Sequence, residues 1–312
     1  MSNFEQRLDA AESVFFARQL ESIDARQYQV LFSETKSRLL LPTQGGVSED
    51  ALVYTWRMFE HFGQAKVIAN AADDLPSVDV SGQEQSVTIK EIGASYGWDL
   101  REIKASMRGG FDLDAEKAMS CRRAIDRKID DLLATGSTLL GMQGFLTLTG
   151  APTFTLGTKS GGGLTWANGT PDEIAADLTG IVTARKLALK GAGGAEFDRF
   201  TIVIPIDKYA LIAQTRMGDG SDKTILKFVL ETSPWIESIE SWSKCTLAGA
   251  GGATDRMVAY VKDPAVVSAI VPQEFRALPP QQRNLRYVIN CTASCGGVVA
   301  RYLVALAYAD GL

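Results

Sequence analysis

The longest helical pattern in the chain extends from residue 111 to residue 136 and contains no proline and no internal glycine. Its apolar side chains recur every three or four residues, so they share one face of a helix, while the charged side chains lie largely on the rest. That apolar face consists of Ala118, Cys121, Ile125, Ile129, Leu132 and Leu133. Asp112 and Asp114 fit the N-terminal end, where the helix dipole favours negative charge, and Gly136 fits the position after the last turn. The pattern predicts an amphipathic helix about 33 Å long that packs on a sheet.

Residues 52–68 and 87–100 are rich in valine, isoleucine and aromatic residues, which strands favour. Between them lies a polar, turn-rich segment that contains Asp73, Asp74 and Glu84. We predict that the two strands pair as a long hairpin, and that its acidic tip cannot form a core of its own. Because an isolated two-stranded hairpin is marginally stable in water, a neighbouring molecule is expected to cover it.

Residues 4–32 carry apolar groups among frequent charges, which predicts an N-terminal amphipathic helix or arm. A terminal segment is usually disordered unless it docks on something, so this arm is expected to pack on a neighbouring subunit. The side chains expected to make that contact are Phe15, Phe16, Leu20 and Ile23. Removing residues 1–40 is therefore expected to leave a folded core and to abolish or misdirect assembly.

Helices and strands follow the long helix in an irregular order. Residues 141–150, bounded by glycines, are predicted to form a short apolar strand. Thr170 as N-cap, Pro171 at the first helical position and Glu173 as the capping-box partner predict a helix that continues to about Lys190. Further strands are predicted at residues 200–206, 235–242, 255–263 and 266–272, and helices at residues 207–217 and 222–232, the second one capped by Ser221.

The C-terminal region begins with residues 276–282, which contain two prolines and are predicted to be a linker. Residues 287–311 are predicted to form two closing strands, with Gly296 and Gly297 between them. This order of elements is not a regular alternation of strands and helices, and it indicates the α+β class.

Composition and charge exclude several classes of protein. With 312 residues, 46% of them hydrophobic, the chain can bury one large or two modest cores. A net charge of −5 gives it no global basic character that would attract nucleic acid. No apolar run approaches the ~18 residues of a membrane span, and the polar, acidic N-terminus does not resemble a signal peptide.

Residues that carry chemistry are few. Cys291 and Cys295 offer only two ligands, fewer than structural zinc requires, so the cysteines are interpreted as reduced thiols of a cytosolic chain. The single histidine, His61, lies in a strand-like stretch, and the glycine clusters lack the context of a phosphate-binding loop. We therefore predict no catalytic residue, no metal and no cofactor. The carboxylates considered for a remote enzymatic alternative, and otherwise expected on a solvated surface, are Asp130, Asp131 and Asp207.

Four stretches together resemble a known family. Residues 96–150 resemble its spine helix and the turn that follows, and residues 170–184 resemble its next helix. Residues 200–212 resemble the strand, proline and helix of its axial domain, and residues 265–311 resemble its closing strands. On these stretches the chain is similar to tailed-phage major capsid proteins of the Hong Kong 97 fold, in the short class without a fused scaffolding segment.

The resemblance implies a function as well as a fold. The expected subunit is a structural protein, not an enzyme, that self-assembles through hexamers and pentamers into an icosahedral shell around double-stranded DNA in the host cytoplasm. Scaffolding, portal and cement proteins are further candidate partners. An encapsulin-like nanocompartment shell that encloses a cargo enzyme is the alternative. The implied parts are an N-terminal arm (1–50), an E-loop hairpin (51–100), a P-domain with the spine helix (101–190), an A-domain (191–284) and closing strands (285–312).

A shell needs complementary surfaces between its subunits, and the charges suggest one pair of them. The acidic residues of the hairpin are expected to meet basic residues on the long helix of an adjacent subunit. The basic candidates are Arg122, Arg123 and Arg127, with Arg108 and Lys128 beside them.

The resemblance also raises the question of covalent crosslinking, because some family members join subunits through a glutamate-assisted lysine–asparagine bond. Lys66 and Lys90 lie in the hairpin region and Asn284 and Asn290 lie late in the chain, but after Asn290 the acidic residue is Asp310 and no glutamate follows. We expect no crosslinking, so that boiled, reduced shells give one band near 33.7 kDa on a denaturing gel. A ladder of multiples would contradict this expectation.

Overall fold

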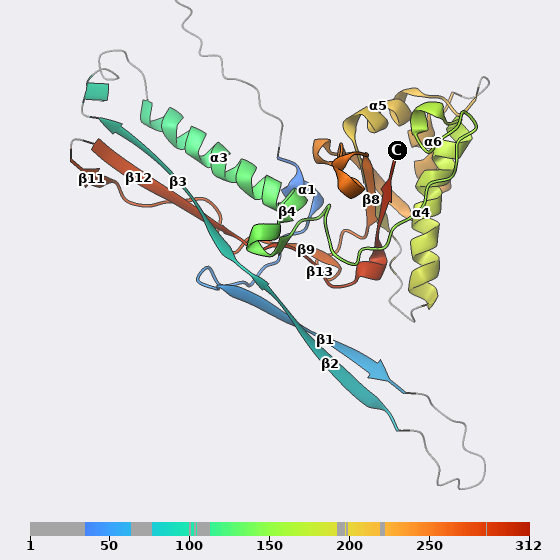
Figure 1. Cartoon of the computed structure of the whole chain (residues 1–312), viewed down its shortest axis with the longest axis horizontal. Coiled ribbons are helices and arrows are strands. Elements are labelled where there is room, and N and C mark those ends of the chain that lie inside the picture. The colour runs from blue at the N-terminus through green and yellow to red at the C-terminus, as the bar shows by residue number, and fades with distance from the viewer. Residues whose placement is uncertain are drawn as a thin grey trace, which may run out of the picture. The chain divides into compact units, whose positions relative to one another are not determined.

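The computed structural model describes residues 35–63, 77–99, 101–102, 104, 113–191, 197, 199–218, 222–284 and 286–312. The chain divides into the units Met1–Glu34 and Thr35–Leu312, and the described residues all belong to the second unit. Its helices (Figure 1) are α1 (Ser37–Leu40), α3 (Leu113–Thr135), α4 (Pro171–Gly191), α5 (Ile206–Gln214) and α6 (Ile225–Thr232). Its 3-10 helices are η3 (Thr138–Leu140), η4 (Trp166–Asn168), η5 (Ser243–Cys245), η6 (Ala250–Gly252) and η7 (Leu303–Ala305).

Its strands are β1 (Val53–Phe62), β2 (Asp79–Thr88), β3 (Lys90–Asp99), β4 (Gly136–Ser137), β5 (Met142–Gln143), β6 (Phe200–Ile204), β7 (Ile236–Ser241), β8 (Arg256–Tyr260), β9 (Val267–Ile270), β10 (Arg276–Ala277), β11 (Gln281–Arg283), β12 (Arg286–Cys295), β13 (Gly297–Ala300) and β14 (Leu306–Asp310). Helices and strands are mixed along the chain, which confirms the α+β prediction.

The long helix α3 confirms the prediction made from its apolar pattern. Cys121, Ile125, Ile129 and Leu133 are all buried, and the helix lies against β3 and β12 (Figure 1). Gly136 follows the helix with a φ of +69°, and a Cβ there would meet the carbonyl oxygen of residue 142 at 2.4 Å. Glycine is therefore required at the position where the chain leaves the helix.

Residues 141–150 form a turn and not the strand that was predicted. Strand β5 covers two of these residues and pairs with β4. The backbone N–H groups of Phe145 and Leu146 donate to the carbonyl oxygens of Leu133 and Ala134, at 2.7 and 2.9 Å. The last carbonyls of a helix lack partners within it, so the turn supplies them. Its apolar side chains are buried as those of a strand would be, which explains the error.

The hairpin differs from the prediction in its second strand. Strand β1 pairs antiparallel with β2 over the whole length of both, and β3 pairs instead with β12. Val87 and Thr88 do pair with Tyr54 and Val53, but residues 90–99 pair with β12, so the predicted pairing of residues 52–68 with residues 87–100 is wrong beyond Thr88. Every side chain of β2 from Asp79 to Ser86 is exposed, so no apolar alternation distinguishes this strand from a loop. Its extended form comes from backbone pairing with β1.

A second sheet has the strand order β14-β8-β6-β7, with β6 and β7 parallel and the other neighbours antiparallel. Every residue of β6 and β8 is buried, as expected from the apolar run at residues 200–206. Helices α5 and α6 contact β7, and α4 contacts β14. The rings of Phe145 and Tyr260 meet edge to face with centroids 4.8 Å apart, which joins the turn after α3 to this sheet.

The C-terminal region contains more strands than predicted. The proline-containing linker includes β10 and β11, which both pair with β12. The closing region holds β12, β13 and β14, where two strands were predicted. Strands of two or three residues carry no periodic signal. Gly297 opens β13 with a φ of +78°, and a Cβ there would meet the carbonyl oxygen of Gln143 at 2.6 Å. The glycine pair therefore lies where the chain passes from the sheet of β12 to the separate sheet of β13 and β9.

The helix caps are partly as predicted. At α4, Glu173 N donates to Thr170 Oγ1 at 3.4 Å and Thr170 N donates to Glu173 Oε2 at 2.9 Å, which confirms the capping box. Ser221 lies outside the described residues. The N-cap of α6 is Thr224, whose side chain accepts from Lys227 N, so the prediction of Ser221 as its cap is wrong.

The last residues of the predicted arm pack into the core. Leu40 and Leu41 are buried, the backbone N–H of Ser37 donates to Asp130 Oδ1 at 3.0 Å, and the hydroxyl of Tyr260 donates to the Leu40 carbonyl oxygen at 2.5 Å. Removing residues 1–40 would therefore take Ser37 and Leu40 out of the core, so we now expect this truncation to destabilise the core that the sequence alone predicted to stay folded. The boundary at Glu34 between the two units is the better place to cut.

Candidate assembly surface

Strands β1 and β2 form a two-stranded ribbon, called the ribbon from here on. Three large apolar residues near the end of the ribbon at residue 63 are exposed to solvent. The exposed fraction is 63% for Phe59, 70% for Val78 and 50% for Val80. A Cβ at Gly82 would lie 3.2 Å from the Phe59 ring, which covers that glycine. Two strands alone are marginally stable in water, and exposed apolar groups that lie close together mark contact surfaces. The ribbon therefore has the properties of an element that another molecule covers.

The structure places Glu84 inside the ribbon and not in a flexible tip. Glu84 faces Arg57 across the two strands, and Glu84 Oε1 lies 2.6 Å from Arg57 Nε. Both side chains are more than half exposed, so the pair adds little stability. Of the other residues predicted for the interface, those outside the described part of the chain are Phe15, Phe16, Leu20, Ile23, Asp73 and Asp74.

The basic residues predicted on the long helix do share a surface. Arg122, Arg123 and Arg127 are all exposed on α3. Arg122 makes an ion pair with Asp126 one turn further on, at 3.7 Å, and its guanidinium carbon lies 5.9 Å from the centre of the Phe275 ring. The structure thus brings the three arginines together, while Glu84 makes its ion pair within the ribbon.

Arg301 holds the root of the ribbon, a role that sequence reasoning missed. Its Nη1 donates to the carbonyl oxygen of Pro264 at 2.6 Å and to Ser268 Oγ at 3.0 Å. Its Nη2 donates to Gln44 Oε1 and to the hydroxyl of Tyr54 in β1, both at 3.0 Å. One guanidinium therefore joins β1 to three other segments. An arginine after a strand carries no sequence signal for such a contact.

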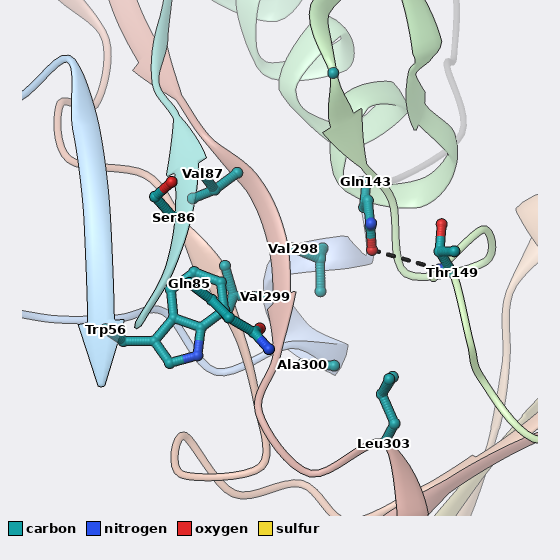
Figure 2. A pocket seen from close by; sticks show the side chains of 11 residues that line it. Trp56, Gln85, Ser86, Val87, Gln143, Thr149, Val298, Val299, Ala300 and Leu303 are labelled. Carbon is teal, nitrogen blue, oxygen red and sulfur yellow. Dashed lines mark hydrogen bonds between the residues drawn. The ribbon is translucent and has the colours of Figure 1, made fainter. Parts of the chain in front are cut away.

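A pocket of about 490 Å³ lies beside this root, between the ribbon and the strands of the C-terminal region (Figure 2). We call it the root pocket. It is lined by Trp56, Gln85, Ser86, Val87, Gly141, Gln143, Thr149, Val298, Val299, Ala300 and Leu303. The indole nitrogen of Trp56 is buried and has no hydrogen-bond acceptor among the described residues. Gln143 Oε1 accepts from the backbone N–H of Thr149 at 3.4 Å, the dashed line in Figure 2.

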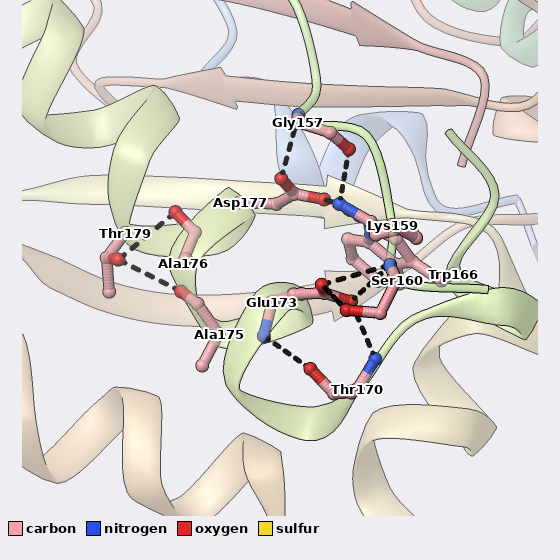
Figure 3. A network of polar contacts seen from close by, with 10 residues as sticks. All are labelled: Gly157, Lys159, Ser160, Trp166, Thr170, Glu173, Ala175, Ala176, Asp177 and Thr179. Atoms are coloured by element: carbon pink, nitrogen blue, oxygen red, sulfur yellow. Dashed lines mark hydrogen bonds and ion pairs between the residues drawn. The ribbon is translucent and has the colours of Figure 1, made fainter. Parts of the chain in front are cut away.

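A buried ion pair fixes the loop before α4 (Figure 3). Lys159 and Asp177 lie 2.5 Å apart, Nζ to Oδ2, with side chains only 1% and 6% exposed. Asp177 Oδ2 also accepts from Trp166 Nε1 at 2.9 Å, and Lys159 Nζ donates to the carbonyl oxygen of Gly157 at 3.0 Å. Because a buried charge is costly unless it is paired and hydrogen-bonded, these contacts fix the loop on α4.

Beside this pair, Glu173 joins the same loop to the first turn of α4. The hydrogen bond from the Ser160 hydroxyl, followed by that from the Thr170 backbone, lowers the pKa of Glu173 to about 2. The ionised carboxylate therefore stabilises the folded chain fully above pH 4.5, and this contribution is lost as the pH falls towards 2. We expect Glu173→Gln to lower the melting temperature at pH 6, with a difference from wild type that shrinks below pH 4.5. A difference that stays constant down to pH 2.5 would contradict this assignment.

Of the three carboxylates considered for catalysis, Asp130 and Asp131 make structural contacts and Asp207 is exposed, as expected for a solvated surface. Asp130 is buried and accepts from Ser37 N, so its expected place on a solvated surface is wrong. Asp131 binds the ammonium group of Lys244. Asp207 lies 3.8 Å from Lys208 Nζ. Over the described ranges, no cluster of three histidine, cysteine or acidic side chains could hold a metal ion.

All four cysteines are buried and free. Burial raises the pKa of Cys245 and of Cys291 to about 12, so these thiols remain protonated and unreactive at neutral pH. No helix in the described part of the chain is long and apolar enough to cross a membrane.

Comparisons with known proteins agree with this architecture. The structure is similar to the capsid of Myoviridae phage XM1, with a TM-score of 0.80 at 18% identity over 96% of this chain and 100% of that one. The capsid of the native GTA particle is also similar, with a TM-score of 0.68 at 13% identity over 97% of this chain and 99% of that one. The structure from Gordonia phage Cozz has a TM-score of 0.58 to this one, at 14% identity over 94% of this chain and 91% of that one. These likenesses confirm the Hong Kong 97-type capsid fold.

The sequence gives the family directly. No curated protein sequence matches the chain, but the sequence model of the major capsid protein family matches residues 63–312, which is well over half of its length. This match does not favour the encapsulin alternative. The chain therefore belongs to the major capsid protein family and is a structural subunit that assembles with its own copies into a capsid shell.

Proposed function

We propose that the chain forms the hexamers and pentamers of an icosahedral tailed-phage shell around double-stranded DNA, with the ribbon as its principal reaching element. The observation that carries this proposal is the exposure of the ribbon. A strand pair that leaves Phe59, Val78 and Val80 in water needs a partner surface. Head-to-tail contacts of one such element with a different surface on the next copy close into rings, which are the capsomers of the proposal.

In this proposal, a charged contact joins the segment between β1 and β2 of one copy to α3 of the next copy. Asp73 and Asp74 belong to that segment, while Arg122, Arg123 and Arg127 are exposed on α3. Each exposed ion pair contributes only about 0.2–1 kcal/mol, but the contact recurs around every ring. Charge complementarity of this kind fixes the register of an interface more than its strength.

Reversing the acidic residues tests this contact. We expect Asp73→Lys with Asp74→Lys to preserve the circular dichroism and melting temperature of the unassembled chain. Shell yield should fall several-fold, because like charges then face each other, and the effect should weaken in high salt. Adding Arg123→Glu with Arg127→Glu should restore part of the yield.

The matched control reverses two exposed acidic residues elsewhere, Asp222→Lys with Glu237→Lys, and it should assemble normally. If the Asp73 and Asp74 variant gives wild-type shell yield at every salt concentration, the acidic segment is only solvated surface. Sedimentation of shells from unassembled chain measures the yield.

The proposal assigns the chain no catalytic role, no cofactor and no membrane partner. This part of the proposal is supported by the family match, the structural contacts of Asp130 and Asp131, and the exposed position of Asp207. An overall charge of −5 fits a shell that does not bind its genome tightly. DNA protected from nuclease inside native particles would support the viral shell, whereas particles that hold only protein cargo would support a nanocompartment.

Electron microscopy of the purified chain is the direct test of assembly. Closed particles of uniform size, formed by the chain alone, would show that no scaffolding protein is obligatory. Particles that form only when a second phage protein is added would identify that protein as the scaffold. A chain that stays monomeric under all conditions would overturn the proposal.

A further inference from the structure

We propose that the root pocket receives residues 13–17 of a second copy of the chain. This inference rests on the proposed function, in which the N-terminal arm docks on a neighbouring subunit. It goes further because it names the receiving site and the segment that binds there. The pocket lies at the root of the ribbon, so a bound arm contacts the ribbon, strand β13 and the turn after α3 at once (Figure 2).

The chemistry of the pocket defines its occupant. None of its lining residues is charged, and Val87, Val298 and Leu303 give it an apolar wall. The buried N–H of Trp56 lacks an acceptor among the described residues, and leaving a buried donor without a partner is unfavourable. A backbone carbonyl of an extended peptide would satisfy that donor while its side chains fill the apolar part. At about 490 Å³ the pocket has the size of a site for a few side chains.

The arm contains a segment that fits this description. Residues 13–17 read Ser-Val-Phe-Phe-Ala, without a charge, between Glu12 and Arg18. They combine a small apolar residue with the phenylalanines Phe15 and Phe16, which need a covered site. The acidic segment between β1 and β2 fits worse, because Asp73 and Asp74 would have to lose their water without a positive partner.

The length of the connecting chain allows the segment to reach a second copy, as the proposed function requires. Between this segment and Thr35, where the described structure begins, lie residues 18–34. A connector of that length can extend by about 60 Å, which is enough to reach an adjacent subunit. A second uncharged stretch, residues 27–33, lies directly before Thr35 and therefore has a much shorter reach.

Engineered cysteines test the site in assembled shells. Ala17→Cys or Val14→Cys is combined with Ala300→Cys in the wall of the pocket, and both phenylalanines stay in place. The native cysteines are all buried and should not interfere. After oxidation by oxygen with a copper catalyst, we expect a ladder of multiples of 33.7 kDa on a non-reducing gel, lost when a thiol reductant is added.

The controls separate the possible outcomes. Ala17→Cys with Leu187→Cys, an exposed position on α4, should give no ladder. A faster-moving monomer band with Ala300→Cys would mean that the arm binds its own subunit, and a ladder only with Tyr28→Cys would assign the pocket to residues 27–33. Either result, or shells that form without any crosslink, would overturn the inference but leave the arm's role in assembly intact.

A variant that fills the root pocket tests the docking site without engineered cysteines. Ala300→Trp should keep the melting temperature of the unassembled chain within a few degrees and lower shell yield at least tenfold, because the arm loses its site. If Ala300→Trp folds and assembles like wild type, the pocket is not a docking site. If a chain lacking residues 1–34 assembles normally, it is the proposed function of the arm that fails.

Discussion

Asp177→Ala is expected to lower the free energy of unfolding of the unassembled chain by about 3–5 kcal/mol. The reason is the position of Lys159, whose side chain is 1% exposed and whose ammonium group lies 2.5 Å from the Asp177 carboxylate. Removing the carboxylate leaves a buried positive charge without its partner, and the indole N–H of Trp166 also loses its acceptor. Urea unfolding followed by tryptophan fluorescence measures the change.

Two controls show whether the charge is responsible. Asp172→Ala removes an exposed acidic residue from the same helix and should cost well under 1 kcal/mol. Lys159→Met with Asp177→Leu removes both charges and should recover most of the stability, because apolar residues often replace a buried pair at little cost. If Asp177→Ala and Asp172→Ala unfold at the same urea concentration, the pair has no role in stability.

Truncation at two neighbouring positions is expected to separate assembly from folding: the shorter truncation should prevent assembly, and the longer one should destabilise the fold. A chain that begins at Thr35 should fold and melt like the full chain, because it keeps the whole compact unit Thr35–Leu312, but it should form no shells. A chain that begins at Leu41 also loses Ser37 and Leu40, and it should be destabilised before assembly is tested. Burial of one leucine side chain alone contributes roughly 1.5–3 kcal/mol. Asp130 would also keep a buried carboxylate without its Ser37 partner.

Circular dichroism melts and electron microscopy of the two truncated chains measure fold and assembly separately. Normal shells from the chain that begins at Thr35 would rule out the arm as an assembly element. Equal stability of both chains would show that α1 is not part of the core. The comparison thus tests the function of the arm and the position of its boundary in one experiment.

Prediction from sequence succeeded where one helix or strand carries its own pattern. The apolar face of α3, the run that forms β6 and the capping box of α4 each depend on residues a few positions apart. The α+β class and the resemblance to the capsid family followed from the order of such elements. Prediction failed at β2, whose polar residues adopt a strand only because β1 pairs with them.

The contacts of the candidate assembly surface were mostly beyond the reach of sequence. Arg301 donates to Gln44 and Tyr54, which are more than two hundred positions away in the chain, and the root pocket joins segments as distant as Trp56 and Leu303. No local pattern records such pairs. The charge of the arginines on α3 and their helical spacing, by contrast, were visible in the sequence.

The sequence by itself determined the elements that carry a periodic pattern, the class and the family of this protein, because helical and strand periodicity and caps are local properties of neighbouring residues. Only the tertiary structure decided the partners: β3 beside β12, the residues after α3 folded onto its end, and Leu40 within the core. The physical reason is that burial and pairing depend on what the rest of the chain brings to each residue, and many arrangements share one local pattern.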